Sequence, residues 1–119
     1  MEQAMAAPQF ELVHDLLDLA GARWTIDVLA TLRGNRMRFS EIAHAVEGIS
    51  QKQLTATLRS LQRHGFAMRV AFPTIPPRVE YELTELGLEF ARSVGPLRSF
   101  AMRNQGTIEA ARRQFDNAA

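Results

Sequence analysis

Two helices separated by a tight turn constrain the fold of this 119-residue chain more than any other feature. Ser50 precedes the second helix as its N-cap, and Gln53, three residues later, completes a Ser-x-x-Gln capping box. The apolar face of that helix is a row of leucines at helical spacing, Leu54, Leu58 and Leu61. A shorter helix precedes it, with Ser40 expected as its N-cap, and Gly48 lies in the turn between the two. This order predicts a helix-turn-helix unit whose second helix spans residues 51–64 and stops at Gly65.

The segments around this unit predict further helices and one hairpin. Amphipathic helices are expected over residues 9–20 and 24–32, before the unit. After it, two alternating strands joined by a proline-rich tip form a hairpin, or wing, over residues 66–83. A helix capped by Thr84 comes next; Gly95-Pro96 is expected to break it, and a last helix follows over 96–116, with Gly106 as a second point of interruption. The predicted fold is mainly α with a small β-hairpin wing, a winged helix-turn-helix in one domain over 1–119.

The net charge of +1 conceals an uneven distribution along the chain. Residues 33–78 hold eight basic and two acidic side chains, a net charge of +6, whereas residues 1–32 carry −4 and residues 79–119 carry −1. No acidic residue occurs in the 29 positions from Ser50 to Arg78. Positive charge gathered in this way favours a polyanionic partner, and the helix-turn-helix pattern indicates that the partner is double-stranded DNA.

Composition excludes several other classes of protein. The chain has no cysteine, which rules out disulfides, cysteine-ligated zinc and thiol chemistry. No apolar run approaches the ~20 residues of a membrane span, and the N-terminus does not resemble a signal peptide. His14 and Asp18 share a helix face without a third ligand nearby, so we expect neither a metal nor a cofactor. Three separated histidines and no phosphate loop leave no catalytic constellation. The chain is expected to be a small, soluble, cytoplasmic protein and not an enzyme.

Polar side chains occupy the face of the second helix opposite its leucines. They supply the donors and acceptors that base edges and phosphates require, and Ala56 on the same side allows a close approach. The residues predicted to contact DNA from this helix are Ser50, Gln51, Lys52, Gln53, Thr55 and Arg59. This helix is therefore the predicted recognition helix, and we expect it in the major groove.

Three arginines outside the helix extend this predicted DNA-contacting surface. Arg36 and Arg38 lie just before the first helix of the unit, within reach of phosphates. Arg78 flanks the wing, whose tip can approach the adjacent minor groove.

Five short motifs distributed along the chain point to a known family. They are Gly21-Ala22-Arg23-Trp24-Thr25, Arg38-Phe39-Ser40-Glu41-Ile42, Gly48-Ile49-Ser50, Leu54-Thr55-x-x-Leu58-Arg59-x-Leu61 and the run Pro76-Pro77-Arg78-Val79-Glu80-Tyr81-Glu82-Leu83-Thr84-Glu85-Leu86-Gly87. Together they resemble the HxlR-type bacterial regulators over roughly residues 14–100, and the last run is specific to that family. The resemblance implies a homodimeric, DNA-binding transcriptional repressor or activator. Some members sense oxidants through a cysteine near the first helix; Glu11 stands about there, so thiol sensing is not carried over.

The terminal helices carry apolar stripes that a single small domain cannot easily cover. The positions predicted to form a dimer interface are Phe10, Val13, Leu17, Leu97, Phe100 and Ile108. The resemblance implies pairing through these helices, which would hold two recognition helices about one DNA turn, ~34 Å, apart over a palindromic operator. The alternative is that both stripes pack only on the chain's own core.

Two other functions stay open on the sequence alone. One is a winged helix used as a protein-interaction module, although such domains usually lack a basic second helix. The other is an architectural DNA binder without sequence preference. A further open point is an unidentified small-molecule effector between the terminal helices and the core, where Phe10, Trp24, Phe100 and Met102 could meet; plain core packing is the competing interpretation.

Overall fold

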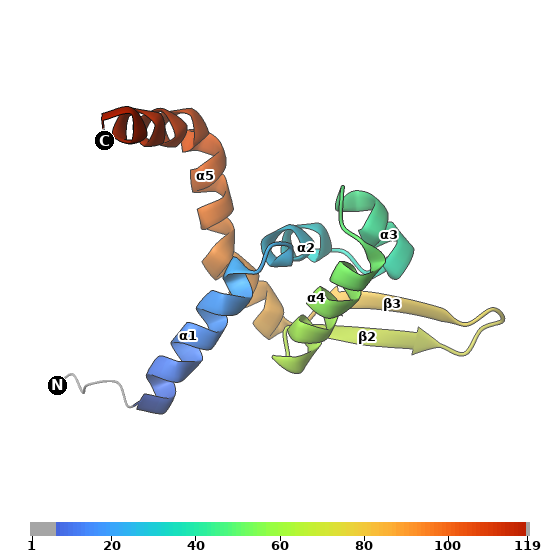
Figure 1. Ribbon diagram of the computed structural model, residues 1–119. Helices are drawn as coiled ribbons and strands as arrows, with labels where there is room; N and C mark the ends of the chain where they lie inside the picture. The colour runs from blue at the N-terminus through green and yellow to red at the C-terminus, as the bar shows by residue number, and fades with distance from the viewer. Residues whose placement is uncertain (1–6, 119) are drawn as a thin grey trace.

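The computed structural model of the protein describes residues 7–118, which form five helices and three strands (Figure 1). The helices are α1 (Ala7–Gly21), α2 (Thr25–Leu32), α3 (Phe39–Ala45), α4 (Gln51–Arg63) and α5 (Glu85–Ala118), and the strands are β1 (Met37–Arg38), β2 (Ala67–Phe72) and β3 (Arg78–Leu83). This order confirms the predicted winged helix-turn-helix fold. Within this part of the chain, no helix combines the length and the apolar character needed to cross a membrane.

The wing belongs to a three-stranded antiparallel sheet in the order β1-β3-β2. Strands β2 and β3 form the predicted hairpin, with Ala67 opposite Leu83 and Phe72 opposite Arg78. Strand β1, which places Met37 opposite Tyr81, was not predicted from the sequence. Two residues are too few to show the alternation that identifies a strand, so only pairing with β3 defines it.

The hydrophobic core lies where α2, α3 and α4 meet the start of β2 and the first turns of α5. Its buried apolar residues are Leu19, Val28, Leu29, Leu32, Ile42, Val46, Leu54, Leu58, Leu61, Phe66, Ala67, Phe90 and Ala91. The three leucines of α4 are completely enclosed, which confirms the predicted inward face of that helix. Burial of three leucine side chains contributes roughly 1.5–3 kcal/mol each, and it fixes the rotation of α4 about its axis.

Helix α4 begins and ends as its sequence predicts. The Ser50 hydroxyl accepts a hydrogen bond from the Gln53 backbone N–H at 3.0 Å, and the Gln53 side-chain oxygen accepts one from the Ser50 N–H at 2.9 Å. At the other end, Gly65 has a φ of +79°, the left-handed conformation that commonly stops a helix. The capping box and the glycine stop are therefore confirmed.

The predicted N-cap of α3 was wrong. The helix begins at Phe39, which puts Arg38 at the cap position and Ser40 inside the first turn. The Arg38 backbone N–H donates to a Glu41 carboxylate oxygen at 2.8 Å. Because an arginine side chain has no acceptor, only this half of a capping box forms. Pairing of β1 with β3 holds Arg38 in an extended conformation and so sets where the helix starts.

The predicted break at Gly95-Pro96 and the interruption at Gly106 were also wrong. Helix α5 runs without interruption for 34 residues through both positions, so residues 96–116 are not a separate helix. A proline inside a helix removes one backbone hydrogen bond, and a bend can accommodate its ring. Pro96 lies in the exposed part of α5, where water can satisfy the carbonyl left without a donor. Figure 1 shows α5 leaving the core and changing direction toward its C-terminus.

Candidate nucleic-acid interface

The outer face of α4 is polar, exposed and without acidic residues. Five of the residues predicted to contact DNA belong to α4, and Ser50 is its N-cap. All six are exposed: Ser50, Gln51, Lys52, Gln53, Thr55 and Arg59. Ala56 and Arg63 are exposed on the same helix. Thr57 is half-buried and its hydroxyl donates to the Gln53 carbonyl at 2.8 Å, so it is satisfied within the helix. The buried leucine row thus orients a continuous polar face toward solvent.

The turn between α3 and α4 fixes how this face is presented. Gly48 has a φ of +90°, a conformation that costs a residue with a Cβ about 1 kcal/mol or more. A Cβ at this position would lie 3.5 Å from the half-buried Trp24 ring, an ordinary contact distance, so the backbone conformation and not the space favours glycine here. The Ile49 N–H donates to the Val46 carbonyl at 3.3 Å and closes the turn.

Ser50 and Gln53 have already committed their oxygen atoms to capping α4. The amide nitrogen of Gln53 has no hydrogen-bond partner among the described residues, and the side chain is exposed. Gln53 can therefore donate toward an acceptor on DNA while its oxygen holds the cap. The two predicted roles of this residue, in capping and in binding, are compatible in one conformation.

Arg36, another residue predicted to contact DNA, forms an ion pair with Glu82. Its guanidinium donates two hydrogen bonds to one carboxylate oxygen of Glu82, at 2.9 and 3.2 Å, and a third to the other oxygen at 2.9 Å. These hydrogen bonds, followed by the attraction of the Glu82 charge, raise the pKa of Arg36. The pair ties the segment before β1 to β3, so Arg36 supports the sheet as well as bordering the predicted interface.

Arg78 and Arg38 differ in burial and in the contacts that their side chains make. Arg78 is half-buried, with its guanidinium carbon 4.4 Å from the centroid of the Phe72 ring and its Nε 3.3 Å from a Glu80 carboxylate oxygen. Arg38 is exposed, and its side chain has no ion pair among residues 7–118. Of the three arginines predicted outside α4, Arg38 is thus the one without an ion pair in the described chain, although Glu80 lies opposite it in the register of β1 and β3.

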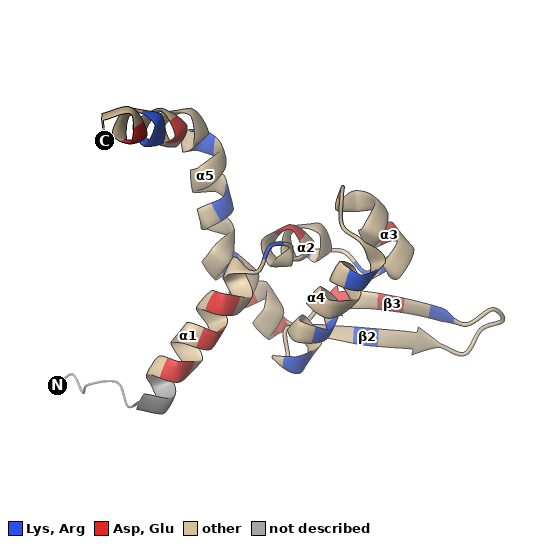
Figure 2. Cartoon of the chain, viewed as in Figure 1, with Lys and Arg blue, Asp and Glu red and all other residues tan. Residues whose placement is uncertain are grey.

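The acidic partners Glu80 and Glu82 were not predicted from the sequence. The signal was present, because both follow the alternation of β3 and so point to the same side of that strand. Recognising β1, which pairs Arg38 with Glu80 in register, would have placed basic and acidic side chains together. Figure 2 shows the resulting distribution: basic residues on α4, basic and acidic residues together on the wing strands, and acidic residues along α1.

The histidines do not gather into a site in the described part of the chain. No cluster of three potential metal ligands occurs among the residues described, and His14 and His44 are exposed. His64 is the C-cap of α4, and its Nδ1 is 2.8 Å from the Ser60 carbonyl oxygen. This histidine therefore interacts with a carbonyl at the end of the helix.

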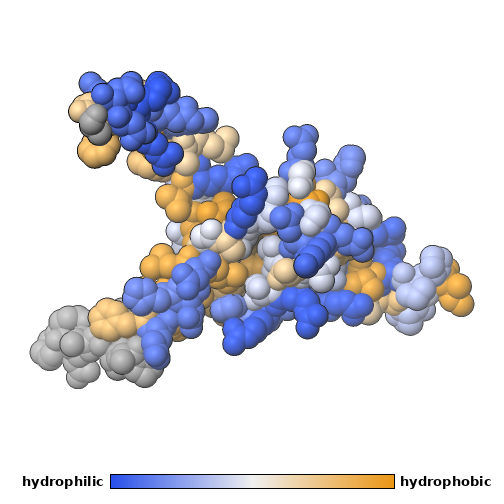
Figure 3. Space-filling model, viewed as in Figure 1, coloured by the Kyte–Doolittle hydropathy of each residue, from blue (hydrophilic) through white to orange (hydrophobic). Residues whose placement is uncertain are grey.

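The predicted dimer positions lie on helices that diverge from the core. Phe10, Val13, Leu17, Leu97 and Phe100 are exposed, whereas Ile108 is half-buried. Leu12, Met102 and Phe115, which the prediction did not include, are exposed as well. Helices α1 and α5 form a V, and Figure 3 shows apolar side chains along its inner sides. Neither stripe is covered by the described part of the chain.

The amino-acid sequence of this chain is similar to those of known proteins of one family. The model of the HxlR-like helix-turn-helix family matches residues 19–109. YtfH of Escherichia coli K12, described as an uncharacterized HTH-type transcriptional regulator, is 35% identical over 83% of this chain and 79% of its own length. The regulator sll1512 of Synechocystis, described in the same terms, is 43% identical over 75% and 70% of the two chains.

Solved structures agree with the sequence matches. The fold superimposes with a TM-score of 0.77 on ytfH of Salmonella typhimurium, a protein assigned to the transcriptional regulators, at 34% identity over 85% of this chain and 90% of that one. The redox regulator HypR in its reduced form gives a TM-score of 0.75 at 30% identity, over 82% and 97% of the two chains. The chain belongs to the HxlR-like helix-turn-helix family and is a transcriptional regulator of that type, not an enzyme.

Proposed function

We propose that this regulator binds a palindromic operator as a homodimer in the cytoplasm, with α4 in the major groove and the β2–β3 wing beside the minor groove. The observation that carries the proposal is the exposed, acid-free polar face of α4 over its fully buried leucines. A helix held in this way can enter a groove without acidic side chains opposing the phosphates.

The residues of the proposed interface divide by the contact each can make. Lys52 and Arg59 supply positive charge for phosphates or for guanine edges, and Gln51 and Thr55 supply neutral donors and acceptors. Arg38, exposed beside β1, can reach toward a phosphate, because its side chain forms no ion pair with an acid among the described residues. At the wing tip, Ile75 is completely exposed, which suits an apolar contact in the minor groove.

The proposed homodimer uses the V formed by α1 and α5. Its exposed apolar side chains come from both ends of the sequence and face outward from the core. A second copy offers an identical surface, so a two-fold interface would bury both stripes at once. Two copies related in this way would present two recognition helices, and for that reason we expect the operator to be palindromic.

Fluorescence anisotropy with the chain's own upstream DNA and a scrambled duplex, over a salt series, tests the proposal. We expect tighter binding to the native sequence and an affinity that falls steeply as salt rises, because released counterions drive phosphate contacts. The double variant Lys52→Ala/Arg59→Ala should lose about 1–3 kcal/mol per residue. The control Arg112→Ala/Arg113→Ala removes the same charge from the exposed end of α5 and should bind like the wild type.

The other outcomes separate the competing functions. Equal affinity for the native and scrambled duplexes would identify an architectural DNA binder. Unchanged operator affinity in a folded Lys52→Ala/Arg59→Ala variant would disprove the assigned interface. No binding to a genomic fragment library would favour the protein-interaction module.

A further inference from the structure

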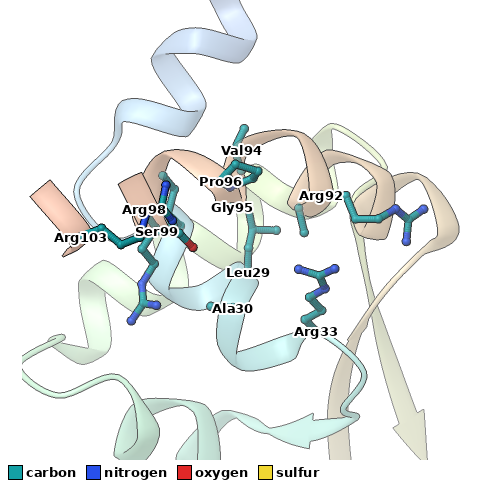
Figure 4. Close-up of a pocket in the computed structure, with 12 residues that line it drawn as sticks. Leu29, Ala30, Arg33, Arg92, Val94, Gly95, Pro96, Arg98, Ser99 and Arg103 are labelled. Atoms are coloured by element: carbon teal, nitrogen blue, oxygen red, sulfur yellow. The ribbon is translucent and has the colours of Figure 1, made fainter. Parts of the chain in front are cut away.

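A cavity of about 710 Å³ lies between α2 and α5, outside the proposed DNA interface. Leu29 and Ala30 of α2 form one side, and Val94, Gly95 and Pro96 of α5 form the other (Figure 4). Its volume falls in the range of small-molecule sites. The prediction for an effector site named other residues. This cavity is not lined by any of them, namely Phe10, Trp24, Phe100 and Met102.

The lining of this cavity is strongly basic. Four arginines and no acidic residue line it: Arg33, Arg92, Arg98 and Arg103. Arg98 is the one with an acidic partner among the described residues, since its Nε lies 3.4 Å from an Asp27 carboxylate oxygen outside the lining. The positive charges around the cavity repel each other. An anion bound between them would make the electrostatic energy of the site favourable.

Along the cavity, apolar side chains separate two pairs of arginines. Figure 4 shows Arg33 and Arg92 at one end, Arg98 and Arg103 at the other, and the apolar side chains between them. Arg33 directly follows the end of α2 and Arg92 belongs to α5, so the basic side chains at that end come from both sides of the cavity. Guanidinium groups bind carboxylate or sulfonate oxygens through paired hydrogen bonds.

We propose that this cavity binds a small organic anion with an apolar body, such as an aromatic or aliphatic carboxylate or sulfonate. The acid group lies between Arg33 and Arg92, and the apolar body covers Leu29, Ala30 and Pro96. An inorganic anion would leave the apolar walls uncovered, and a neutral apolar compound would leave the arginines without a counter-charge.

Such a ligand would link the helix-turn-helix unit to the helices of the proposed dimer interface. Helix α2 packs on α3 of the helix-turn-helix unit, and α5 carries part of the apolar V. An anion bridging α2 and α5 would therefore act on the angle between the DNA-binding unit and the proposed dimer arm. This regulatory consequence depends on the proposed function, whereas binding of the anion does not.

Fluorescence titration of the full chain with anilinonaphthalene sulfonate tests the proposal, with the uncharged analogue N-phenylnaphthylamine as the matched probe. We expect saturable binding of the sulfonate at one site per chain. The variant Arg33→Gln/Arg92→Gln should weaken sulfonate binding about tenfold, because it removes charge-assisted hydrogen bonds. It should leave binding of the uncharged probe unchanged. Arg112→Gln/Arg113→Gln, with the same loss of charge from α5, should keep wild-type affinity for both probes.

A second pair of variants tests the location without altering charge. A Cβ at Gly95 or at Gly106 would meet no atom within 4 Å, so both positions accept a side chain. Gly95→Gln extends from the lining of the cavity and should lower sulfonate affinity at least as much as the arginine variant. Gly106→Gln, on the same helix but not in the lining, should not change it. Thermal unfolding by circular dichroism verifies that all variants are folded.

Wild-type sulfonate affinity in folded Arg33→Gln/Arg92→Gln or Gly95→Gln protein would overturn the proposal. Operator binding without the probe distinguishes this failure from failure of the proposed function. If Arg33→Gln/Arg92→Gln weakens operator binding as much as the α4 variant does, these arginines contact DNA and the anion site is wrong. If the probe results hold while the wild type binds no operator, the anion site stands and the proposed function falls.

Discussion

At the scale of single residues, the closest backbone approach is made at Gly87. This buried glycine lies in the first turn of α5, and a Cβ there would overlap the carbonyl oxygen of Phe66 and lie 2.7 Å from its carbonyl carbon. Gly87→Ala should therefore lower the free energy of unfolding by about 1–3 kcal/mol, as overpacking of a core does. Gly106→Ala, in an open part of the same helix, should raise it by about 0.5–1 kcal/mol. Urea denaturation followed by circular dichroism measures both, and equal effects would contradict the assigned contact.

At the scale of elements, the two serines near the helix-turn-helix unit differ in role although their sequence contexts look alike. Ser50 caps α4, whereas Ser40 lies inside the first turn of α3 and its side chain has no hydrogen bond among the described residues. Ser50→Ala should cost about 1 kcal/mol of stability and loosen the start of the recognition helix. Ser40→Ala should change the free energy of unfolding by less than about 0.5 kcal/mol. Comparable losses in the two variants would show that α3 is capped by Ser40 after all.

At the scale of the whole molecule, the apolar V should bring two copies together. Analytical ultracentrifugation at micromolar concentration should give a species of about twice the 13.4 kDa chain mass. Leu17→Asp and Leu97→Asp place a charge at positions each 61% exposed in the single chain, and either should shift the equilibrium to monomer. Ile75→Asp, at the fully exposed wing tip, should remain dimeric. A wild type that sediments only as a monomer would disprove the dimer.

Local signals in the sequence determined most of the elements and their faces. The Ser50 capping box, the three α4 leucines and the stop at Gly65 act within one or two helical turns, so neighbours in sequence were enough to predict them. The alternation of β2 and β3 and the exposed polar face of α4 follow from the same short-range periodicity.

Only the tertiary structure decided the features that depend on distant partners. Strand β1 exists because β3 pairs with it, and that pairing moves the start of α3 to Phe39 and joins Arg36 to Glu82. Helix α5 passes through Pro96 at an exposed position, where water can satisfy the freed carbonyl and a bend can accommodate the ring, although the local rule predicts a break. The basic cavity forms where α2 and Arg33, the residue after it, lie against α5. Residues up to 77 positions apart line it, and no local periodicity predicts such a contact.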